Sequence, residues 1–214
     1  MKQKLIFASN NKGKIAEVKK ILGDNFEVLS MSEIGFFDEI EETGDTFEEN
    51  AQIKARAIFD RFKIPVFSDD SGLCVDILNG EPGAYSALYH CQGDDRGNNI
   101  KLLDNLAKIE EGAKIRDKSA KIDKSAKFVA VVAYIDKDGF CKFFRGEADG
   151  YIIDIKREKS LDSVLSGNGF GYDPLFFCHE LGKTFGAASL EQKNSVSHRA
   201  RALEKLSDYL KSNK

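Results

Sequence analysis

The stretch KLIFASNNKGKIAEVKKILGDNFEVLS (residues 4–30) predicts an α/β fold. Lys4–Ala8 is a short apolar run typical of a buried strand, and Phe26–Ser30 is a second one. Between these runs, one face of a helix is marked by four apolar residues at helical spacing: Ile15, Val18, Ile21 and Leu22. The order strand, loop, helix, strand is typical of proteins whose helices cover a β-sheet.

Similar patterns continue along the chain. Thr46 and Glu49 match a capping box, so we expect a helix from there to about residue 62. Asp138-Gly139 is a hairpin-turn signal between two apolar runs, and Asp69–Gly72 has the composition of a turn. Further strands are predicted at 65–68, 73–77, 127–135 and 140–144, and further helices at 98–106 and 195–211.

Composition limits the classes of function. The chain has 214 residues, of which 42% are hydrophobic, and a formal net charge of −3. We expect one globular domain, and not a protein that grips nucleic acid through bulk positive charge. The longest apolar run, Phe128–Ile135, is too short to span a bilayer, and the N-terminal residues do not match an export signal. We therefore expect a cytoplasmic protein with no membrane anchor.

Two polar clusters predict phosphate and metal chemistry. Ser9–Lys14 lies where the first strand leads into the first helix, and N–H groups at a helix N-terminus attract anions. The alternative is a capped helix with exposed lysines. Glu41-Glu42 and Asp69-Asp70 are paired carboxylates, which suit a hard cation such as Mg²⁺ and a carboxylate base that activates water. The alternative for Asp69-Asp70 is a polar turn.

Two further clusters complete the pattern. Gly167–Pro174 combines glycines with aromatic residues and Asp173, a set that can stack on a purine and accept a hydrogen bond from it. The alternative is a tight turn with core aromatics. Lys193–Arg199 supplies cations at the start of the last helix, and Lys54 adds another, although such residues are usually solvated surface charges. Together, the four clusters suggest an enzyme that acts on a metal–nucleotide phosphate.

Taken in order, these motifs resemble the inosine triphosphate pyrophosphatase family. The resemblance covers residues 9 to about 203, which is nearly the whole chain. It is carried by Ser9–Lys14, Glu41–Gly44 with Phe47–Ala51 and Lys54-Ala55, Asp69–Leu73, Pro82-Gly83 with Tyr85–Ala87, Gly169–Pro174, Gly182–Thr184, and Lys193 with Ser197–Arg199. Each segment alone is a weak signal, but all of them occur in the order in which the family has them.

The resemblance implies an activity and a fold. Members hydrolyse ITP, dITP and XTP to the monophosphate and pyrophosphate, require Mg²⁺, and remove deaminated purines from the nucleotide pool. They are typically cytoplasmic homodimers. Their α/β fold is an elongated mixed β-sheet flanked by helices, with two lobes around a central cleft. For this chain, the resemblance implies a single such domain over residues 1–214.

The resemblance also implies roles for individual residues. Asp70 would be the general base and a metal ligand, and either Glu41 or Glu42 would complete the Mg²⁺ site, while Asp69 supports it. The residues expected to bind the phosphates are Ser9, Asn10, Asn11, Lys12, Gly13, Lys14, Lys54 and Lys193. Ser71 would contact substrate, and the residues expected to line the base and sugar pocket are Phe170, Gly171, Tyr172, Asp173, Lys193, His198 and Arg199.

Base selectivity would follow from hydrogen-bond patterns. Hypoxanthine and xanthine present N1–H as a donor and O6 as an acceptor, so Asp173 can accept from the first and Arg199 can donate to the second. Adenine reverses both groups and would leave two buried polar groups unpaired, which rejects it strongly. Guanine shares the N1 and O6 pattern, so its rejection requires a contact at the 2-amino group.

The sequence also departs from the family pattern. Asn10 stands where many relatives have Gly, and Leu88 stands where many bacterial relatives have Arg. The lysine-rich segment 108–127 looks longer than usual and is expected to be a solvated loop or helix face. Two alternatives stay open: a pyrophosphatase for other modified or pyrimidine nucleotides, and a nucleotide-binding sensor without turnover.

Overall fold

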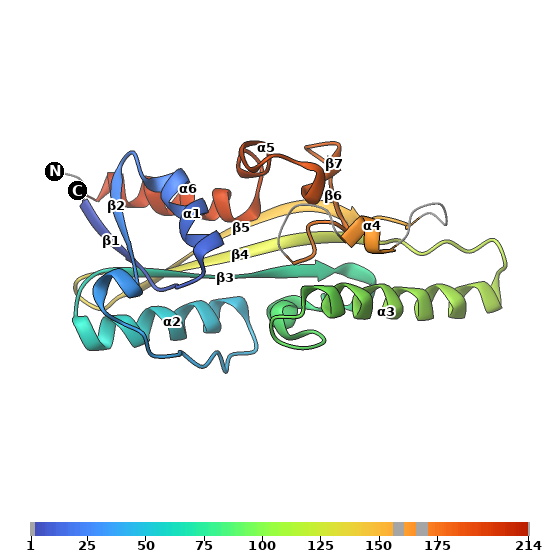
Figure 1. The fold of residues 1–214 in the computed structure, drawn as a ribbon, viewed down its shortest axis with the longest axis horizontal. Coiled ribbons are helices and arrows are strands. Elements are labelled where there is room, and N and C mark those ends of the chain that lie inside the picture. Colours follow the sequence, from blue (N-terminus) through green and yellow to red (C-terminus); the bar gives the residue numbers. More distant parts are fainter. Residues whose placement is uncertain (1–2, 156–160, 166–170, 214) are drawn as a thin grey trace. The chain divides into compact units, whose positions relative to one another are not determined.

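Figure 1 shows the computed structural model, which describes residues 3–155, 161–165 and 171–213. Within these residues, seven strands form one sheet in the order β2-β1-β3-β4-β5-β6-β7. The strands are β1 (Gln3–Phe7), β2 (Phe26–Ser30), β3 (Val66–Val75), β4 (Ser125–Ile135), β5 (Cys141–Ile152), β6 (Phe176–Cys178) and β7 (Lys183–Thr184). The helices are α1 (Lys12–Leu22), α2 (Phe47–Phe62), α3 (Asp95–Arg116), α4 (Leu161–Leu165), α5 (Leu190–Asn194) and α6 (His198–Ser212).

The sheet is mixed. β1 pairs in parallel with β2 and β3, whereas β6 pairs antiparallel with β5 and β7. The mixed sheet and its flanking helices confirm the predicted α/β fold class.

The chain divides into two compact units. Unit 1 comprises Met1–Ser71, Val129–Glu147 and Ser197–Lys214, and unit 2 comprises Gly72–Phe128 and Ala148–Val196. Strands β3, β4 and β5 therefore each contribute residues to both units. A single domain with two lobes around a central cleft stays a prediction.

In unit 1, helices cover both faces of the sheet (Figure 1). On one face, Leu22 of α1 and Leu203 of α6 pack with Phe7 of β1 in one apolar cluster. On the other face, Ile58 of α2 packs with Ile6 of β1. Consecutive residues of a strand point to opposite faces, so each strand supplies both clusters in alternation.

Strand β3 follows the same alternation at its start. Phe67 belongs to the cluster with α1 and α6, and Val66 belongs to the cluster with α2. If the alternation continues, odd-numbered residues further along β3 face α1 and α6, and even-numbered residues face α2. The alternation therefore decides where the two aspartates of this strand point.

Unit 2 has its own core, in which aromatic rings are prominent. The ring centroid of Phe128 lies 4.8 Å from that of Phe176 and 5.7 Å from that of Phe185. Leu102 and Leu106 of α3 are buried in the same cluster. Because β6 begins at Phe176, this core anchors the segment of chain that directly precedes the strand.

The predicted turn at Asp69–Gly72 is wrong. Residues Val66–Val75 form one continuous strand, β3, in place of two short strands on either side of an acidic turn. The turn-like composition is overridden because Lys14, Lys54 and Arg199 pair with the two aspartates and make their burial in a strand possible.

Other elements differ mainly in their ends. The capping box is confirmed, since Thr46 Oγ1 accepts a hydrogen bond from Glu49 N at 3.2 Å and Glu49 Oε2 accepts one from Thr46 N at 3.0 Å. The helix predicted at 98–106 extends over Asp95–Arg116, so part of the lysine-rich segment is helical. The last helix begins at His198, and the sequence patterns do not predict α5.

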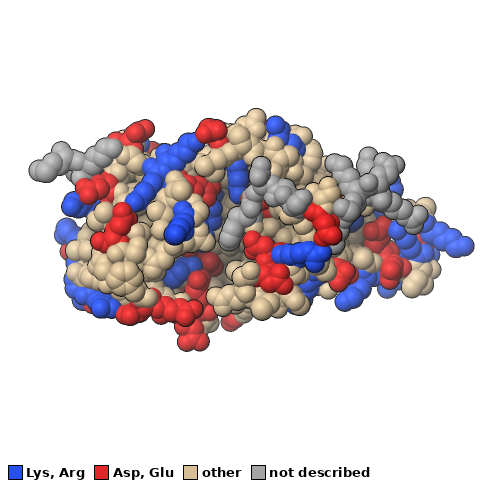
Figure 2. All heavy atoms as spheres, in the orientation of Figure 1, with Lys and Arg blue, Asp and Glu red and all other residues tan. Residues whose placement is uncertain are grey.

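Two observations concern the surface. In the described part of the chain, no helix is both long and apolar enough to cross a membrane. Basic and acidic side chains are interspersed on the face that Figure 2 draws. That face therefore differs from the broad basic surface typical of nonspecific nucleic-acid binding.

Glu33, in the short 3₁₀ helix that follows β2, predicts a pH-dependent contribution to stability. Glu33 accepts hydrogen bonds from Ser30 N and Ser30 Oγ, both at 2.7 Å, and from Lys19 Nζ at 2.9 Å. The backbone N–H of Ser30, its hydroxyl and Lys19 lower the pKa of Glu33 from 4.5 to about 2. A carboxyl whose pKa is lower in the folded state stabilises it above the unfolded pKa, and this contribution is lost as the pH falls from 4.5 to about 2.

We therefore expect Glu33→Gln to lower the free energy of unfolding by about 1 kcal/mol at neutral pH, a figure discounted because the side chain is 43% exposed. The difference from wild type should vanish as the pH approaches 2. Urea unfolding at several pH values measures it, with Glu27→Gln on β2 as the exposed control. A loss that is the same at every pH would refute the electrostatic origin.

Candidate active site

The loop between β1 and α1 forms a capped helix N-terminus. Asn11 caps α1, because its Oδ1 accepts a hydrogen bond from Lys14 N at 3.1 Å, and Ser9 Oγ accepts one from Asn11 N at 3.1 Å. The first helical residues, Lys12 and Gly13, are exposed. The start of α1 is therefore open to solvent, and the positive end of its helix dipole suits an anion.

Asn10 tethers this loop to the next part of unit 1. Its Oδ1 accepts a hydrogen bond from Ser32 N at 3.0 Å. Ser32 begins a short 3₁₀ helix, Ser32–Ile34. Glycine has no side chain to make this contact, so the departure from the family pattern at Asn10 adds a tether to the loop.

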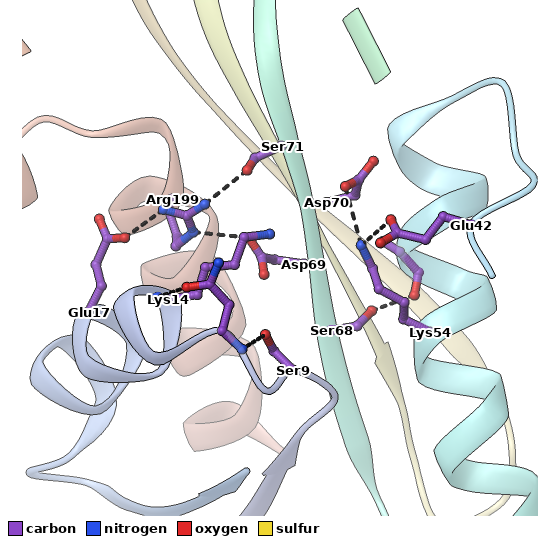
Figure 3. Close-up of polar contacts among 12 residues, drawn as sticks. Ser9, Lys14, Glu17, Glu42, Lys54, Ser68, Asp69, Asp70, Ser71 and Arg199 are labelled. Carbon is purple, nitrogen blue, oxygen red and sulfur yellow. Dashed lines mark hydrogen bonds and ion pairs between the residues drawn. The ribbon is translucent and has the colours of Figure 1, made fainter. Parts of the chain in front are cut away.

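Asp69 and Asp70 are neighbours on β3, but their side chains point to opposite faces of the sheet (Figure 3). Asp69 points toward α1 and α6, and Asp70 points toward α2. Both are buried, with 2% and 8% of their surface exposed. Strand alternation therefore places each aspartate in its own ion cluster, on opposite faces of the sheet.

The Asp69 cluster consists of Lys14, Glu17, Asp69, Ser71 and Arg199, from α1, β3 and α6. The Arg199 guanidinium donates from Nε to Asp69 Oδ2 at 2.9 Å and from Nη1 to Glu17 Oε2 at 2.5 Å. Its Nη2 donates to Ser71 Oγ at 2.9 Å. Lys14 Nζ lies 3.2 Å from Asp69 Oδ2. Arg199 thus holds the two residues of β3 that flank Asp70.

Charge pairing opposes the effect of burial on the pKa values of three residues in this cluster. Burial alone would raise the pKa of Asp69, but Lys14 and Arg199 lower it well below its usual range. Burial alone would lower the pKa of Arg199, but Asp69 and Glu17 raise it. Burial lowers the pKa of Lys14, and Asp69 opposes this shift in part. The Asp69 carboxylate is therefore stabilised in its charged form by Lys14 and Arg199, and it is poorly suited to accept a proton.

The Asp70 cluster, on the α2 face, consists of Glu42, Lys54 and Asp70 (Figure 3). Lys54 Nζ lies 2.5 Å from Glu42 Oε2 and 3.2 Å from Asp70 Oδ1. Lys54 reaches this place because it lies on the buried side of α2, between Ala51 and Ile58 along the helix. One ammonium therefore bridges two carboxylates.

Asp70 has the properties of a base. Burial raises the pKa of its carboxyl above the usual value, although Lys54 and Lys14 oppose the shift. Among the described residues, no donor reaches its buried Oδ2 atom. Burial alone would lower the pKa of Lys54, but Asp70 and Glu42 raise it, so the ammonium stays charged. Asp70 therefore combines raised basicity with an oxygen that is open to a further partner.

The Asp70 cluster fits a magnesium ion in its donor chemistry. In the part of the chain that the structure describes, no group of three or more His, Cys, Asp or Glu residues could hold a metal. Mg²⁺ usually takes only one or two protein carboxylates and completes its shell with water and substrate phosphates. Glu42 and Asp70 supply two carboxylates that already share one cation, whereas Glu41 is exposed.

Four of the expected site residues lie in unit 2: Gly171, Tyr172, Asp173 and Lys193. Lys193 Nζ lies 2.6 Å from Asp173 Oδ2, with 15% and 2% of their side chains exposed. Gly171 has a φ of +61°, and its N–H donates to Asp95 Oδ2 at 3.2 Å. Phe170 lies outside the described residues. Asp173 and Lys193 thus form a buried ion pair. A ligand that binds one of these side chains must either displace the other or bind both.

Tyr172 differs from the expectation that its ring faces a purine. The side chain is 3% exposed and belongs to the core of unit 2, and its hydroxyl donates to Ser86 O at 2.9 Å. Burial raises the pKa of this phenol. The ring is buried because it packs in the apolar core with Leu175 and Phe176. Tyr172 therefore anchors the segment that precedes β6 to the core of unit 2.

His198 and Arg199 also lie deeper than expected. Ser197 caps α6 through Ala200 N, which places both residues in the first turn, where 3% and 6% of their surface is exposed. All three nitrogens of Arg199 donate to residues of unit 1. The guanidinium of Arg199 therefore binds residues of β3 and α1, and its expected donation to the purine O6 stays a prediction.

Sequence reasoning missed Glu17, which is 7% exposed and pairs with Arg199. A signal was available in the helical spacing. Glu17 lies three residues after Lys14 and four before Ile21, so it shares the inward face of α1. A carboxylate on the inward face of a helix requires a buried cation as its partner.

Comparison with known proteins identifies the family of the chain. The sequence pattern of the Ham1 family matches residues 5–209. The chain is 42% identical over 218 residues to a dITP/XTP pyrophosphatase of Clostridium perfringens (strain 13 / Type A), and the match covers 98% of each chain. The solved structure of the Staphylococcus aureus Ham1 protein is 40% identical, with a TM-score of 0.79 over 99% of this chain and 100% of that one. A HAM1 protein from Coxiella burnetii is 33% identical, with a TM-score of 0.77 over 98% and 99% of the two chains. The chain therefore belongs to the Ham1 family.

Proposed function

We propose that this protein hydrolyses deaminated purine nucleoside triphosphates, namely ITP, dITP and XTP, to the monophosphate and pyrophosphate. The observation that carries the proposal is the Asp70 cluster, a buried basic carboxylate beside an ammonium and a second carboxylate. The name dITP/XTP pyrophosphatase, borne by relatives about 40% identical over nearly the whole chain, supports this substrate class. Removal of such nucleotides from the pool would be the cellular task.

In this proposal, Asp70 is the general base. Its raised pKa makes the carboxylate a better proton acceptor than an ordinary aspartate, and its Oδ2 has no donor among the described residues. It therefore accepts the proton of the attacking water. Arg199 keeps Asp70 in place indirectly, because it binds the residues on either side of it in β3.

Glu42 and Asp70 would hold the Mg²⁺ ion, and Glu42 is favoured over Glu41 because it shares a cation with Asp70. When bound, the ion would neutralise phosphate charge and help to orient the triphosphate. The start of α1, from Ser9 to Lys14, would bind phosphate oxygens through its N–H groups. Lys54 would add a positive charge as negative charge develops on the phosphates.

In this proposal, residues of unit 2 recognise the purine base. Asp173 would accept a hydrogen bond from the purine N1–H, which inosine and xanthosine have and adenosine lacks. Lys193 pairs with that carboxylate and holds it in place. Gly171 and Phe170 would complete this part of the site.

A nucleotide panel tests the proposed substrate class. Pyrophosphate release is measured from ITP, XTP, GTP, ATP, dTTP and UTP, each with Mg²⁺ and with a chelator. We expect metal-dependent release from ITP and XTP, and release from ATP slower by about 10²-fold or more. Release chiefly from dTTP and UTP would favour a pyrimidine pyrophosphatase. Tight ITP binding without release from any nucleotide would favour a sensor.

A cytoplasmic homodimer is also part of this proposal and comes from the family resemblance alone. Light scattering of the purified protein at micromolar concentration tests the assembly. A mass twice that of the 23.8-kDa chain is expected, and a monomer would refute it.

A further inference from the structure

Lys54 lies between the two carboxylates that would hold the metal ion. Its ammonium is 2.5 Å from Glu42 Oε2 and 3.2 Å from Asp70 Oδ1. The side chains of Lys54 and Asp70 are each 11% exposed and that of Glu42 is 40% exposed, so the contact between Lys54 and Asp70 is the part of the bridge that is shielded from solvent. The protein thus carries its own cation at the site of the proposed metal ion.

The ammonium and a metal ion cannot both use these carboxylates in the same way. Lys54 already occupies Glu42 Oε2 and Asp70 Oδ1, and a divalent cation close to the ammonium would meet strong repulsion. Metal binding therefore requires Lys54 to move away from at least one carboxylate. A displaced ammonium that stays largely buried needs a new anionic partner.

The described residues offer Lys54 little compensation elsewhere. The other acidic group that acts on it is Asp69, which points to the opposite face of the sheet and is held by Lys14 and Arg199. Ser68, which flanks Asp70 on the same face, donates its hydroxyl hydrogen to Ala51 O. The anion that best suits a displaced Lys54 is a phosphate group of the substrate.

We propose that Lys54 is an internal counter-ion that couples metal binding to nucleotide binding. Without nucleotide, Lys54 competes with the metal ion for Glu42 and Asp70 and keeps metal affinity low. With nucleotide, the ammonium transfers to a phosphate and releases both carboxylates. The inference rests on the proposed function, since it takes the metal site and the phosphate ligand from it.

Binding of Mn²⁺ alone to the nucleotide-free protein tests this inference without any turnover. Electron paramagnetic resonance or titration calorimetry gives the dissociation constant. We expect Lys54→Met to bind Mn²⁺ at least about tenfold more tightly than wild type, within the usual range for coupled sites. Lys54→Arg keeps a cation between the carboxylates and should stay close to wild type. Lys211→Met, at the exposed end of α6, is the matched control for loss of one positive charge.

The double variant Lys54→Met with Asp70→Asn locates the effect, because it should lose the tight Mn²⁺ binding of Lys54→Met. If Lys54→Met does not fold without metal, Lys54→Gln serves in its place, with the same expected gain. A folded Lys54→Met or Lys54→Gln protein with wild-type or weaker Mn²⁺ affinity would overturn the inference. A gain in Mn²⁺ affinity for Lys54→Met, together with a wild-type protein that releases no pyrophosphate from any nucleotide, would support the counter-ion role and refute the proposed function separately.

Discussion

Replacement of Asp70 by Asn should lower the turnover number for ITP by about 10³-fold or more, while the dissociation constant for ITP changes only a few-fold. Asn keeps the shape of Asp but cannot accept a proton from water. A general base commonly accelerates the chemical step by roughly 10²- to 10⁴-fold. Loss of a buried charge whose pKa is raised by burial should not destabilise the fold greatly. Single-turnover kinetics and equilibrium binding of ITP separate the two quantities.

The matched control for this variant is Asp38→Asn. Asp38 is also an acidic residue of unit 1, but its side chain is 71% exposed and pairs with Arg61 at the surface. Its replacement should leave turnover unchanged. Near-normal turnover by Asp70→Asn would show that Asp70 is not the base.

Arg199→Met should lower the free energy of unfolding by about 3–5 kcal/mol, the usual cost of removing one partner from a buried ion cluster. The change leaves Glu17 and Asp69 buried, and Ser71 loses its donor. Lys14 alone would then neutralise Asp69, at 3.2 Å. Urea unfolding measures the loss, and a complete failure to fold would also be consistent with it.

Two further variants on α6 test whether the loss comes from the Asp69 cluster. Arg199→Lys retains the charge but not the three directed bonds, so its loss should be smaller. Arg201→Met, two residues along α6, removes a guanidinium that donates to Glu147 O at 2.7 Å and is only partly buried, and should cost about 1 kcal/mol or less. Equal stability of the Arg199→Met and Arg201→Met proteins would refute the structural role of the cluster.

The elements that the sequence predicted well are those decided by short-range patterns. The first strand, helix and strand follow from apolar spacing, and the capping box at Thr46 follows from two residues three positions apart. Such features depend on neighbours within one helical turn or one strand. These elements form as predicted because the tertiary structure agrees with the local conformational preference.

The path of the chain through Asp69 and Asp70 was not predictable in the same way. Two aspartates followed by Ser71 and Gly72 favour a turn in isolation. The strand is stable because its carboxylates find Arg199, which is 130 residues away from Asp69 in sequence, and Lys54, which is 16 residues away from Asp70. A local sequence pattern cannot show contacts between residues so far apart in the chain.

The candidate site shows the same division. The motifs predicted metal and phosphate chemistry, but not that Asp69 and Asp70 lie in separate clusters, because that depends on β3 continuing as a strand through both residues. They also did not distinguish Glu42 from Glu41, since only the position of Lys54 separates the two. Glu17 differs, because its position on the same face of α1 as Val18 and Ile21 predicts that this carboxylate is buried.

The most direct test of the account is the identity of the products formed from dITP. The protein is incubated with dITP and Mg²⁺, and the phosphorus-containing products are quantified by ³¹P NMR. The account predicts equal amounts of dIMP and pyrophosphate, with none formed by Asp70→Asn or in the presence of chelator. Formation of dIDP and orthophosphate, or equally rapid cleavage of dATP, would contradict it.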